Sequence, residues 1–420
     1  MGSDMYETAI PDETILRLNE MSPTKLVVGI PSYRNSRTVS VVVEAVATGL
    51  NRYYAHLQPV IVHADGHSFD KTLSLASMVP LPASVRRVAT RYQGLSGKGT
   101  ALRVIFEIAT QLRANAVLIV EADVVSFEGE WIPKLIEPIL QETADMVLPV
   151  YQHVYPLKPR NDLVLYPILS TMFNLPLRQS IAGEVAMSGA TAAFLTEQDV
   201  WETAVAQFGI DVWMGMQVAF QDKRLIEVEL ESKLHRVHAS QAQAQTKFLQ
   251  QIGTLFRLGY LHQQAWRRPK SYAISAQNRA IHQRQPLESQ PSPSKIWQNG
   301  QVFIKPQTKQ LWKTIIHPSH FELVKTIVNQ SDYQMTFDDQ LWARLVYDFM
   351  VVYNLGEGDP DKVVTSLYPL YLLRHAAILA EADAHRHPQI AYKQAIQRQR
   401  QAFAHQLAYF SQRWDTYTIP

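Results

Sequence analysis

Residues 117–123 read Val-Leu-Ile-Val-Glu-Ala-Asp, a fully apolar run that ends in two acids. An apolar run of this length, rich in β-branched residues, indicates a buried strand. Strands buried on both faces are typical of parallel sheets that carry helices on each side. The run therefore predicts an α/β fold and puts Glu121 and Asp123 at the end of one of its strands.

On both sides of this run, short β-branched segments alternate with longer helical patterns. Strands are predicted at residues 26–30, 60–62, 87–90, 117–120 and 145–150. Helices are predicted at about 36–53 and 100–113, between successive strands. This alternation predicts a Rossmann-like, mostly parallel sheet with helices on both faces.

After residue 150 the pattern becomes mainly helical. We expect helices near 163–175, 195–206, 208–221 and 240–265, and one strand at 225–230. Residues 283–301 are rich in Pro, Ser and Gln, which favours a linker. The predicted division is an extension at 1–24, an α/β domain at 25–282, the linker at 283–301 and a mainly α-helical C-terminal region at 302–420.

Composition excludes several classes of protein. The 420 residues include no cysteine, so disulfides, thiolate nucleophiles and Cys-ligated zinc are ruled out. A net charge of +2 argues against a nucleic-acid-binding protein. The N-terminus is acidic and has no signal-peptide pattern, and Pro369 and Arg374 interrupt the most apolar stretch at 363–380. We therefore expect a cytoplasmic protein with no membrane span.

Four polar segments follow the predicted strands. They lie at residues 31–33, 65–66, 97–99 and 121–123. Ligands of an open parallel sheet bind at the carboxyl ends of its strands. We expect these four segments to meet at one edge of the sheet and to form the binding site.

Each segment has a possible binding role and an alternative, purely structural role. Asp123 could hold a divalent cation and Glu121 a sugar or ribose hydroxyl, but both could belong to a solvated acidic loop. Gly97-Lys98-Gly99 opens a helix and favours an anion, or it is a flexible turn. Asp65 could accept from a nucleobase or ribose, or simply form a turn. Neither a Walker A loop nor a G-x-G-x-x-G fingerprint occurs.

Three further residues could contribute. His235 follows the strand at 225–230 and could join Asp123 as a metal ligand, although a single histidine is more often structural. Glu184 and Asp211 both lie next to glycines, and each could be a helix cap or a surface acid instead.

Seven short motifs occur in the order found in one group of enzymes. They are VGIPSY (28–33), ADGHSFDKT (64–72), GKG (97–99), EAD (121–123), AGE (182–184), FGID (208–211) and KLHR (233–236). The chain resembles glycosyltransferases with the GT-A fold, and more narrowly the glucosyl-3-phosphoglycerate and glucosylglycerate synthases. It is also similar to mannosylglycerate synthase, including FDD at 337–339 and GDP at 358–360. The resemblance covers residues 25–260 well and the last hundred residues loosely.

The resemblance implies roles for particular residues. Pro31 and Tyr33 would line the nucleobase pocket near Asp65, and Lys98 would contact the phosphates. The implied donor-binding residues are Pro31, Tyr33, Asn35, Asp65, Gly97, Lys98, Glu121, Ala122 and Asp123. The implied metal ligands, for Mg²⁺ or Mn²⁺, are Asp123 and His235. The implied catalytic residues are Glu184, on the sugar hydroxyls, and Asp211, near the reacting centre. The implied acceptor-binding residues are Asn161, Arg160 and Gly183.

Three positions depart from the family. Glu121 replaces the first Asp of the D-x-D motif, and Asn35 replaces a Glu that touches the nucleoside, so the nucleobase stays open. Asn161 replaces an acceptor-binding Thr. The nearby cations Lys158 and Arg160 would suit an anionic acceptor, or they are solvated loop charges.

The expected activity is metal-dependent transfer of a hexose with retention of anomeric configuration. The donor would be UDP-glucose or GDP-glucose, and the acceptor a hydroxy acid, glycerate or 3-phosphoglycerate. The product would be a compatible solute of the glucosylglycerate type. Two alternatives remain: the same fold with a polyol, glycoside or lipid acceptor, or a degenerate domain that binds a nucleotide sugar without turnover. A homodimer is also expected.

Overall fold

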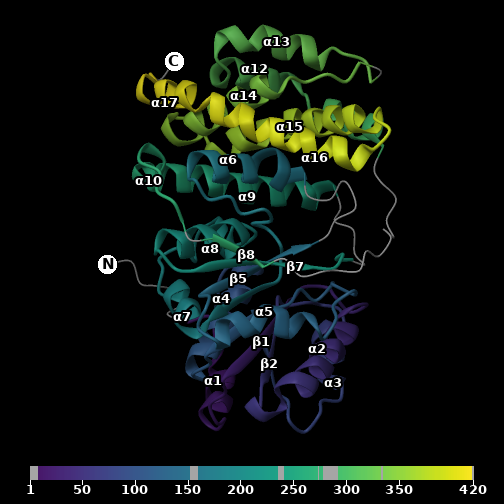
Figure 1. The fold of residues 1–420 in the computed structure, drawn as a ribbon, viewed down its shortest axis with the longest axis vertical. Coiled ribbons are helices and arrows are strands. Elements are labelled where there is room, and N and C mark those ends of the chain that lie inside the picture. Colours follow the sequence, from purple (N-terminus) through teal and green to yellow (C-terminus); the bar gives the residue numbers. More distant parts are fainter. Residues whose placement is uncertain are drawn as a thin grey trace. The chain divides into compact units, whose positions relative to one another are not determined.

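The computed structural model describes residues 8–151, 159–234, 241–272, 274–277, 292–332 and 334–418. The chain forms two compact units. The first comprises residues 1–152, 179–239 and 273–284, and the second comprises 153–178, 240–272 and 285–420. Three separate segments of chain therefore build each unit (Figure 1).

The first unit is built on an eight-stranded sheet with the order β3-β2-β1-β4-β6-β5-β7-β8. Its strands are β1 (Leu26–Ser32), β2 (Val60–Asp65), β3 (Arg86–Arg91), β4 (Ala116–Ile119), β5 (Met146–Tyr151), β6 (Val185–Ser188), β7 (Leu225–Leu230) and β8 (Ile274–Gln277). All neighbouring pairs are parallel except the two that involve β6. The start of β6 therefore lies at the edge of the sheet where the other strands end.

Helices cover both faces of this sheet (Figure 1). On one face α2 (Val39–Tyr54) and α5 (Trp131–Leu140) pack over the alternate β1 residues Leu26, Val28 and Ile30. On the other face α4 (Lys98–Gln111) contacts β1, β2 and β4. A Cβ atom on Gly29 would lie 2.3 Å from Ile105 of α4, so only glycine permits this close packing. The remaining helical segments are α1 (Asp12–Asn19), η1 (Ala55–Leu57), α3 (Thr72–Met78), α7 (Gly189–Thr196), η3 (Ala204–Ala206) and α8 (Ile210–Phe220).

The predicted fold class is confirmed: the chain has a mostly parallel sheet with helices on both faces, and a helical C-terminal region. Two short strands, β6 and β8, were not predicted. The single helix predicted at 195–206 is wrong, because α7 ends at Thr196 and η3 begins only at Ala204.

The second unit is helical. It contains η2 (Asn161–Leu165), α6 (Tyr166–Met172), α9 (Gln241–Leu261), α10 (Gln263–Arg267), α11 (Pro293–Val302), α12 (Pro306–Ile315), α13 (Pro318–Val328), α14 (Asp339–Leu355), α15 (Pro360–Asp383), α16 (Pro388–His405) and α17 (Leu407–Asp415). Among its largest fully buried side chains are Trp342, Tyr347 and Phe403. This core accounts for the aromatic residues of 307–415, and the homodimer stays a prediction.

Helix α15 is the centre of this unit. Within the described ranges it alone is long and apolar enough to cross a membrane, but 83% of its 18-residue apolar window is buried inside the protein. It contacts α9, α11, α14 and α16. Packing against these four helices therefore explains its apolar character.

The division into units differs from the division drawn from composition. Segments 153–178 and 240–272 belong to the helical unit, although they lie within the predicted α/β domain. Of the predicted linker 283–301, residues 293–301 form most of α11, which packs on α15. Residues 283–291 lie outside the described residues.

Candidate functional site

The carboxyl edge of the sheet collects the predicted polar segments. Asp65 is the last residue of β2, Glu121 follows β4, and Lys98 opens α4 after β3. Because β6 is antiparallel, Glu184 reaches the same edge by preceding its strand rather than following it. The site therefore depends on the direction of each strand.

Lys98 joins two of the predicted acids. Its Nζ lies 2.7 Å from Glu121 Oε1 and 2.7 Å from Asp211 Oδ1. The exposed fractions of the three side chains are 10% for Lys98, 22% for Glu121 and 10% for Asp211. Asp211 lies in the first turn of α8, where a carboxylate also interacts favourably with the helix dipole. The structure thus brings three predicted site residues together in a partly exposed group.

A second lysine, Lys233, lies behind this group. Its Nζ contacts Glu121 Oε2 at 2.8 Å and Glu184 Oε2 at 2.6 Å, and donates to the Ala182 carbonyl at 2.8 Å. The Lys233 side chain is 2% exposed. Both oxygens of Glu121 are therefore ion-paired, each to a different lysine.

Glu184 is completely buried, and protein groups contact both of its oxygens. Tyr151, at the end of β5, donates its hydroxyl to Glu184 Oε2 at 2.5 Å. The Glu121 backbone N–H donates to Glu184 Oε1 at 3.3 Å. Buried charges require partners of this kind. In this structure Glu184 holds the ends of β4, β5 and β7 together.

The charges in this cluster stabilise one another. Burial lowers the pKa of Lys98, but the carboxylates of Asp211 and Glu121 outweigh it, so the pKa of Lys98 lies above its ordinary value. Burial also lowers the pKa of Lys233, but the carboxylates of Glu121 and Glu184 outweigh this effect, so the pKa of Lys233 is raised as well. Burial and the Glu184 charge raise the pKa of Tyr151, which keeps this phenol neutral. Both lysines are therefore cations at neutral pH.

The glycines of Gly97-Lys98-Gly99 let another loop pack on the start of α4. A Cβ at Gly99 would lie 1.9 Å from the Val205 carbonyl oxygen, and one at Gly97 would lie 2.4 Å from that of Ala206. The Gly99 N–H donates to Gln207 O at 3.1 Å, and the Gly97 N–H donates to Tyr92 Oη at 3.0 Å. Both glycine amides are used within the protein, so an anion would meet the Lys98 side chain instead.

The ends of β1 and β2 form a hydrogen-bonded string. Asp65 is fully buried and accepts from Ser32 Oγ at 3.1 Å and from Ser68 N and Oγ at 2.8 and 2.7 Å. Burial lowers the pKa of His63 to about 4, so its ring is neutral and its Nε2 lies 2.7 Å from Ser32 Oγ. Asp65 thus holds the turn that follows β2, as its alternative role predicted.

The loop after β1 is more open. Pro31 is buried within β1, whereas Tyr33 is 52% exposed. The Tyr33 N–H donates to Asn35 Oδ1 at 2.8 Å, which sets the turn into α2. Arg34 lies 3.8 Å from the ring centre of Phe69, a residue that is 75% exposed. The loop therefore offers aromatic surface to a planar group.

The predicted metal site is described in part. Asp123 lies in the turn after β4 and is partly exposed, while Ala122 beside it is buried. Within the described ranges no group of three or more His, Asp or Glu side chains forms a metal site. His235 lies outside those ranges, but Leu234 before it is described, and its N–H donates to Ser126 Oγ at 2.8 Å.

The predicted acceptor residues fall in different units. Gly183 lies beside Glu184 in the sheet unit, with φ of +97°. Asn161 is 1% exposed in the helical unit, where its Nδ2 donates to the Arg178 carbonyl at 2.8 Å. Arg160 Nε donates to Gln251 Oε1 at 2.9 Å in the same unit. Lys158 lies outside the described residues.

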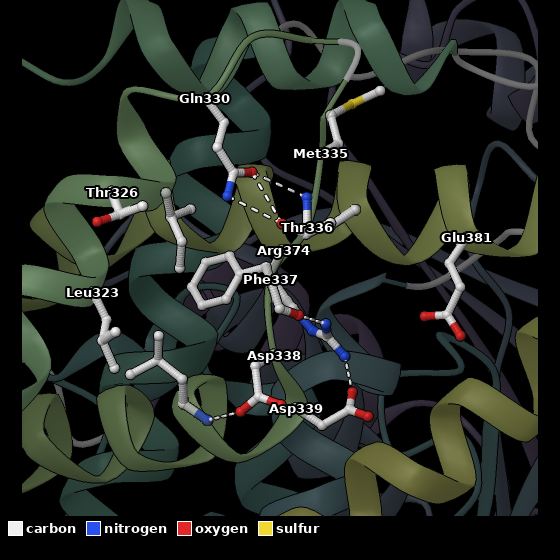
Figure 2. A pocket seen from close by; sticks show the side chains of 13 residues that line it. Leu323, Thr326, Gln330, Met335, Thr336, Phe337, Asp338, Asp339, Arg374 and Glu381 are labelled. Atoms are coloured by element: carbon white, nitrogen blue, oxygen red, sulfur yellow. Dashed lines mark hydrogen bonds and ion pairs between the residues drawn. The ribbon is translucent and has the colours of Figure 1, made fainter.

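The helical unit also has a cavity of about 640 Å³ (Figure 2). The FDD motif at 337–339 lines it, between α13 and α15. Asp338 caps α14 by accepting from the Leu341 N–H at 2.8 Å. Arg374 donates to the Phe337 carbonyl and to Asp339. This motif therefore stabilises the start of α14, and no predicted site residue lines the cavity.

The roles of Lys233 and Tyr151 were not predicted from the sequence. Lys233 lies within the KLHR motif, but His235 is the only residue of that motif whose side chain is a common metal ligand. Tyr151 directly follows the predicted strand 145–150, and this position at a strand end was the available signal. Both residues contact Glu184, which directly precedes β6. Because β6 was not predicted, the sequence did not indicate these contacts.

Comparisons with known proteins give a likeness of fold. No protein-family model and no curated protein sequence matches the chain. It is similar to glucosyl-3-phosphoglycerate synthase from Mycobacterium tuberculosis in complex with Mg²⁺ and UDP, with 19% identity and a TM-score of 0.45, over 56% of this chain and 79% of that chain. The structure of that synthase with Mn²⁺, UDP-glucose and phosphoglyceric acid matches at 20% identity and a TM-score of 0.45, over the same shares of the two chains. A TM-score of this size transfers no substrate, metal or activity to this chain.

Proposed function

We propose that this chain is a glycosyltransferase that moves a hexose from a nucleotide sugar to a small hydroxy acid. The observation that carries the proposal is the group formed by Lys98, Glu121 and Asp211 at the carboxyl edge of the sheet. It combines a cation with two carboxylates, and all three side chains remain partly exposed. A nucleotide sugar needs both, because its diphosphate is anionic and its sugar offers hydroxyl donors.

The nucleotide half of the donor would lie over the ends of β1 and β3. Lys98 carries the positive charge that a leaving diphosphate requires, at the start of α4. Tyr33 supplies exposed aromatic surface for a nucleobase. Asp65 would act on the donor indirectly, by holding the turn at residues 66–68.

Asp123 and His235 would hold a divalent cation, Mg²⁺ or Mn²⁺. A hard cation of this kind binds one or two protein groups together with substrate phosphate oxygens, so two protein ligands are enough. Glu121 does not suit this role, because two lysines already neutralise its charge, although its oxygens can still accept hydrogen bonds. The Leu234–Ser126 hydrogen bond supports the pairing, since it ties the residue before His235 to the loop that carries Asp123. When bound, the cation would supply stabilisation of negative charge on the diphosphate.

Transfer would proceed with retention and without a covalent nucleophile. The acceptor hydroxyl would attack the anomeric carbon on the face from which the diphosphate leaves. The bond from that carbon to the diphosphate oxygen breaks, the bond to the acceptor oxygen forms, and the acceptor proton passes to the diphosphate. Asp211 and Glu121 would orient the sugar, whose transition state is oxocarbenium-like. The hexose is glucose and the acceptor is glycerate or 3-phosphoglycerate.

A donor–acceptor matrix tests this function. UDP-glucose, GDP-glucose, ADP-glucose and GDP-mannose are each combined with D-glycerate or 3-phosphoglycerate, with Mg²⁺, Mn²⁺ or EDTA, and nucleotide release is measured. We expect acceptor-dependent release in one donor column, abolished by EDTA. The control is Lys134→Met, which breaks an ion pair with Glu231 that lies outside the site, and it should retain activity. Donor binding without acceptor-dependent release would contradict the proposed acceptors, and absence of donor binding would contradict the proposed function.

A further inference from the structure

Lys233 has no hydrogen-bonding capacity left for a substrate. An ammonium group has three N–H donors, and those of Lys233 are directed at Glu121, Glu184 and the Ala182 carbonyl, all within 2.8 Å. Its side chain is 2% exposed. Any effect of Lys233 on a reaction must therefore pass through the groups that it holds.

The backbone around Lys233 is shaped to fit its ammonium group. Gly183 has φ of +97°, and a Cβ there would lie 2.6 Å from Lys233 Nζ and 2.4 Å from Glu121 Oε2. Residues 182–184 thus lie directly against the Lys233–Glu121 ion pair. Lys233 therefore ties the segment after β7 to the residues that precede β6 and to the loop after β4.

The charges show what this cation does for Glu121. Without Lys233, Lys98 would still pair with Glu121 and Asp211, but Glu184 would lose the cation that neutralises it. Glu121 and Glu184 would then repel each other, since they are joined by the same ammonium group. Glu121 is the most exposed of the three carboxylates, so its side chain would be the one to move.

We propose that Lys233 is the positioning residue of the sugar subsite: it fixes the Glu121 carboxylate toward the transferred hexose. This inference rests on the proposed function. Lys98, on the other oxygen of Glu121, faces the diphosphate, so removal of Lys233 disturbs binding of the sugar and spares binding of the nucleotide. A residue that only stabilised the fold would weaken both equally.

The variants are chosen to avoid an uncompensated buried charge. Lys233→Met alone would leave Glu184 buried and unpaired, so it is combined with Glu184→Gln. The single variant Glu184→Gln is the reference, because Lys233 still holds Glu121 there. Lys134→Met is the matched control, since its ion pair with Glu231, at 2.7 Å, is close in length to those of Lys233, at 2.8 and 2.6 Å, and lies in the same unit. Lys233→Arg is a second probe, because a planar guanidinium is larger than an ammonium group and Gly183 lies directly against that group.

Titration calorimetry with Mn²⁺ measures the affinity for UDP and UDP-glucose, and for GDP and GDP-glucose. Relative to Glu184→Gln, we expect the double variant to bind the nucleotide sugar at least about tenfold more weakly and the nucleoside diphosphate within about twofold. Lys233→Arg should show the same split, smaller in size, and thermal unfolding reports which variants are folded. Equal weakening for both ligands, or for neither, overturns the inference. A wild-type protein that binds neither nucleotide sugar overturns the proposed function itself, and the inference with it.

Discussion

Gly183 is the residue at which backbone conformation and charge are most tightly linked. Its φ of +97° disfavours any side chain, and the Cα hydrogen that a side chain would replace faces Glu121 and Lys233. We expect Gly183→Ala to lower the free energy of unfolding by about 2 kcal/mol or more, because the methyl group adds a clash to the backbone strain. Urea denaturation at pH 7 measures the change.

Substitution of Gly94 measures the cost of backbone strain without the clash. Gly94 has φ of +102°, but a Cβ there would meet its nearest described atom, on Thr100, only at 3.5 Å. Gly94→Ala should therefore cost only the backbone strain, about 1 kcal/mol. Equal losses for the two variants would show that the contact of Gly183 with the ion pair has no energetic effect.

His63 predicts a pH dependence of stability. Burial lowers its folded pKa to about 4, whereas an unfolded histidine titrates near 6.5. Between these values the unfolded chain binds a proton that the folded chain does not, so stability rises with pH and is lost as pH falls through the window. We expect His63 to account for up to about 3 kcal/mol of this loss.

The comparison is urea denaturation of wild type and His63→Gln from pH 7 to pH 5, where most carboxylates remain ionised. The glutamine amide can still donate to Ser32, and it does not titrate. The difference in free energy of unfolding between the two proteins should shrink as pH falls. A difference that is constant with pH would mean that His63 is equally protonated in both states.

At the scale of elements, the start of α4 depends on the loop that carries η3. The Gly99 N–H donates to Gln207 O, and the Val205 carbonyl lies where a Cβ of residue 99 would be. Gly99→Ala should displace this loop, and α8 with Asp211 directly follows it. We expect nucleotide release to fall by about tenfold or more, as misplacement of a positioning group does, together with a lower unfolding temperature.

A matched change on the same helix is Thr110→Ala near its end, which removes only a hydrogen bond within α4, to the Phe106 carbonyl. That variant should keep its activity and lose less than about 1 kcal/mol of stability. Full activity in Gly99→Ala would show that the loop contact does not position Asp211.

Elements with long apolar runs were predictable, and short ones were not. The run at 117–120 and the pattern of α2, with valines at 39, 42, 43 and 46 on one buried face, carry clear periods. Strand β6 has four residues, Val-Ala-Met-Ser, with little β-branching, and its antiparallel direction leaves no mark on the sequence. Composition at 293–301 favours a linker, yet Ile296 and Trp297 are buried when α11 packs on α15.

The same reasoning separates the predictable and unpredictable parts of the site. Lys98 and Glu121 follow parallel strands, so their meeting at one edge follows from topology. The contact between Lys233 and Glu184 requires β6 to run antiparallel, which the sequence does not indicate. The burial of Asp65 was not predictable either, because it depends on Ser32 and Ser68 donating to its carboxylate within the chain, and its role in donor binding stays a prediction.

At the scale of the whole molecule, the chain leaves the sheet unit twice before its C-terminal region begins. Segments 153–178 and 240–272 join the helical unit, where α9 contacts α14 and α15, and α6 contacts α16. Phe248 and Phe256 of α9 are completely buried. The sheet unit is therefore not a continuous piece of sequence that can be cut out at the predicted linker.

This interleaving predicts the outcome of truncation. A chain ending at residue 291 keeps α6 and α9 but loses the helices that cover them, so their apolar faces would be exposed. We expect it to aggregate, as measured by light scattering. A second truncation ends at residue 284 and replaces 153–178 and 240–272 with Gly/Ser linkers. This truncation removes the helices that have lost their packing partners and keeps β8 paired with β7. It should stay monodisperse and show the circular dichroism spectrum of an α/β protein. If the first truncation is monodisperse and unfolds at the wild-type temperature, the helices of segments 153–178 and 240–272 do not need the C-terminal region to cover them, and the two-unit description of the chain is wrong.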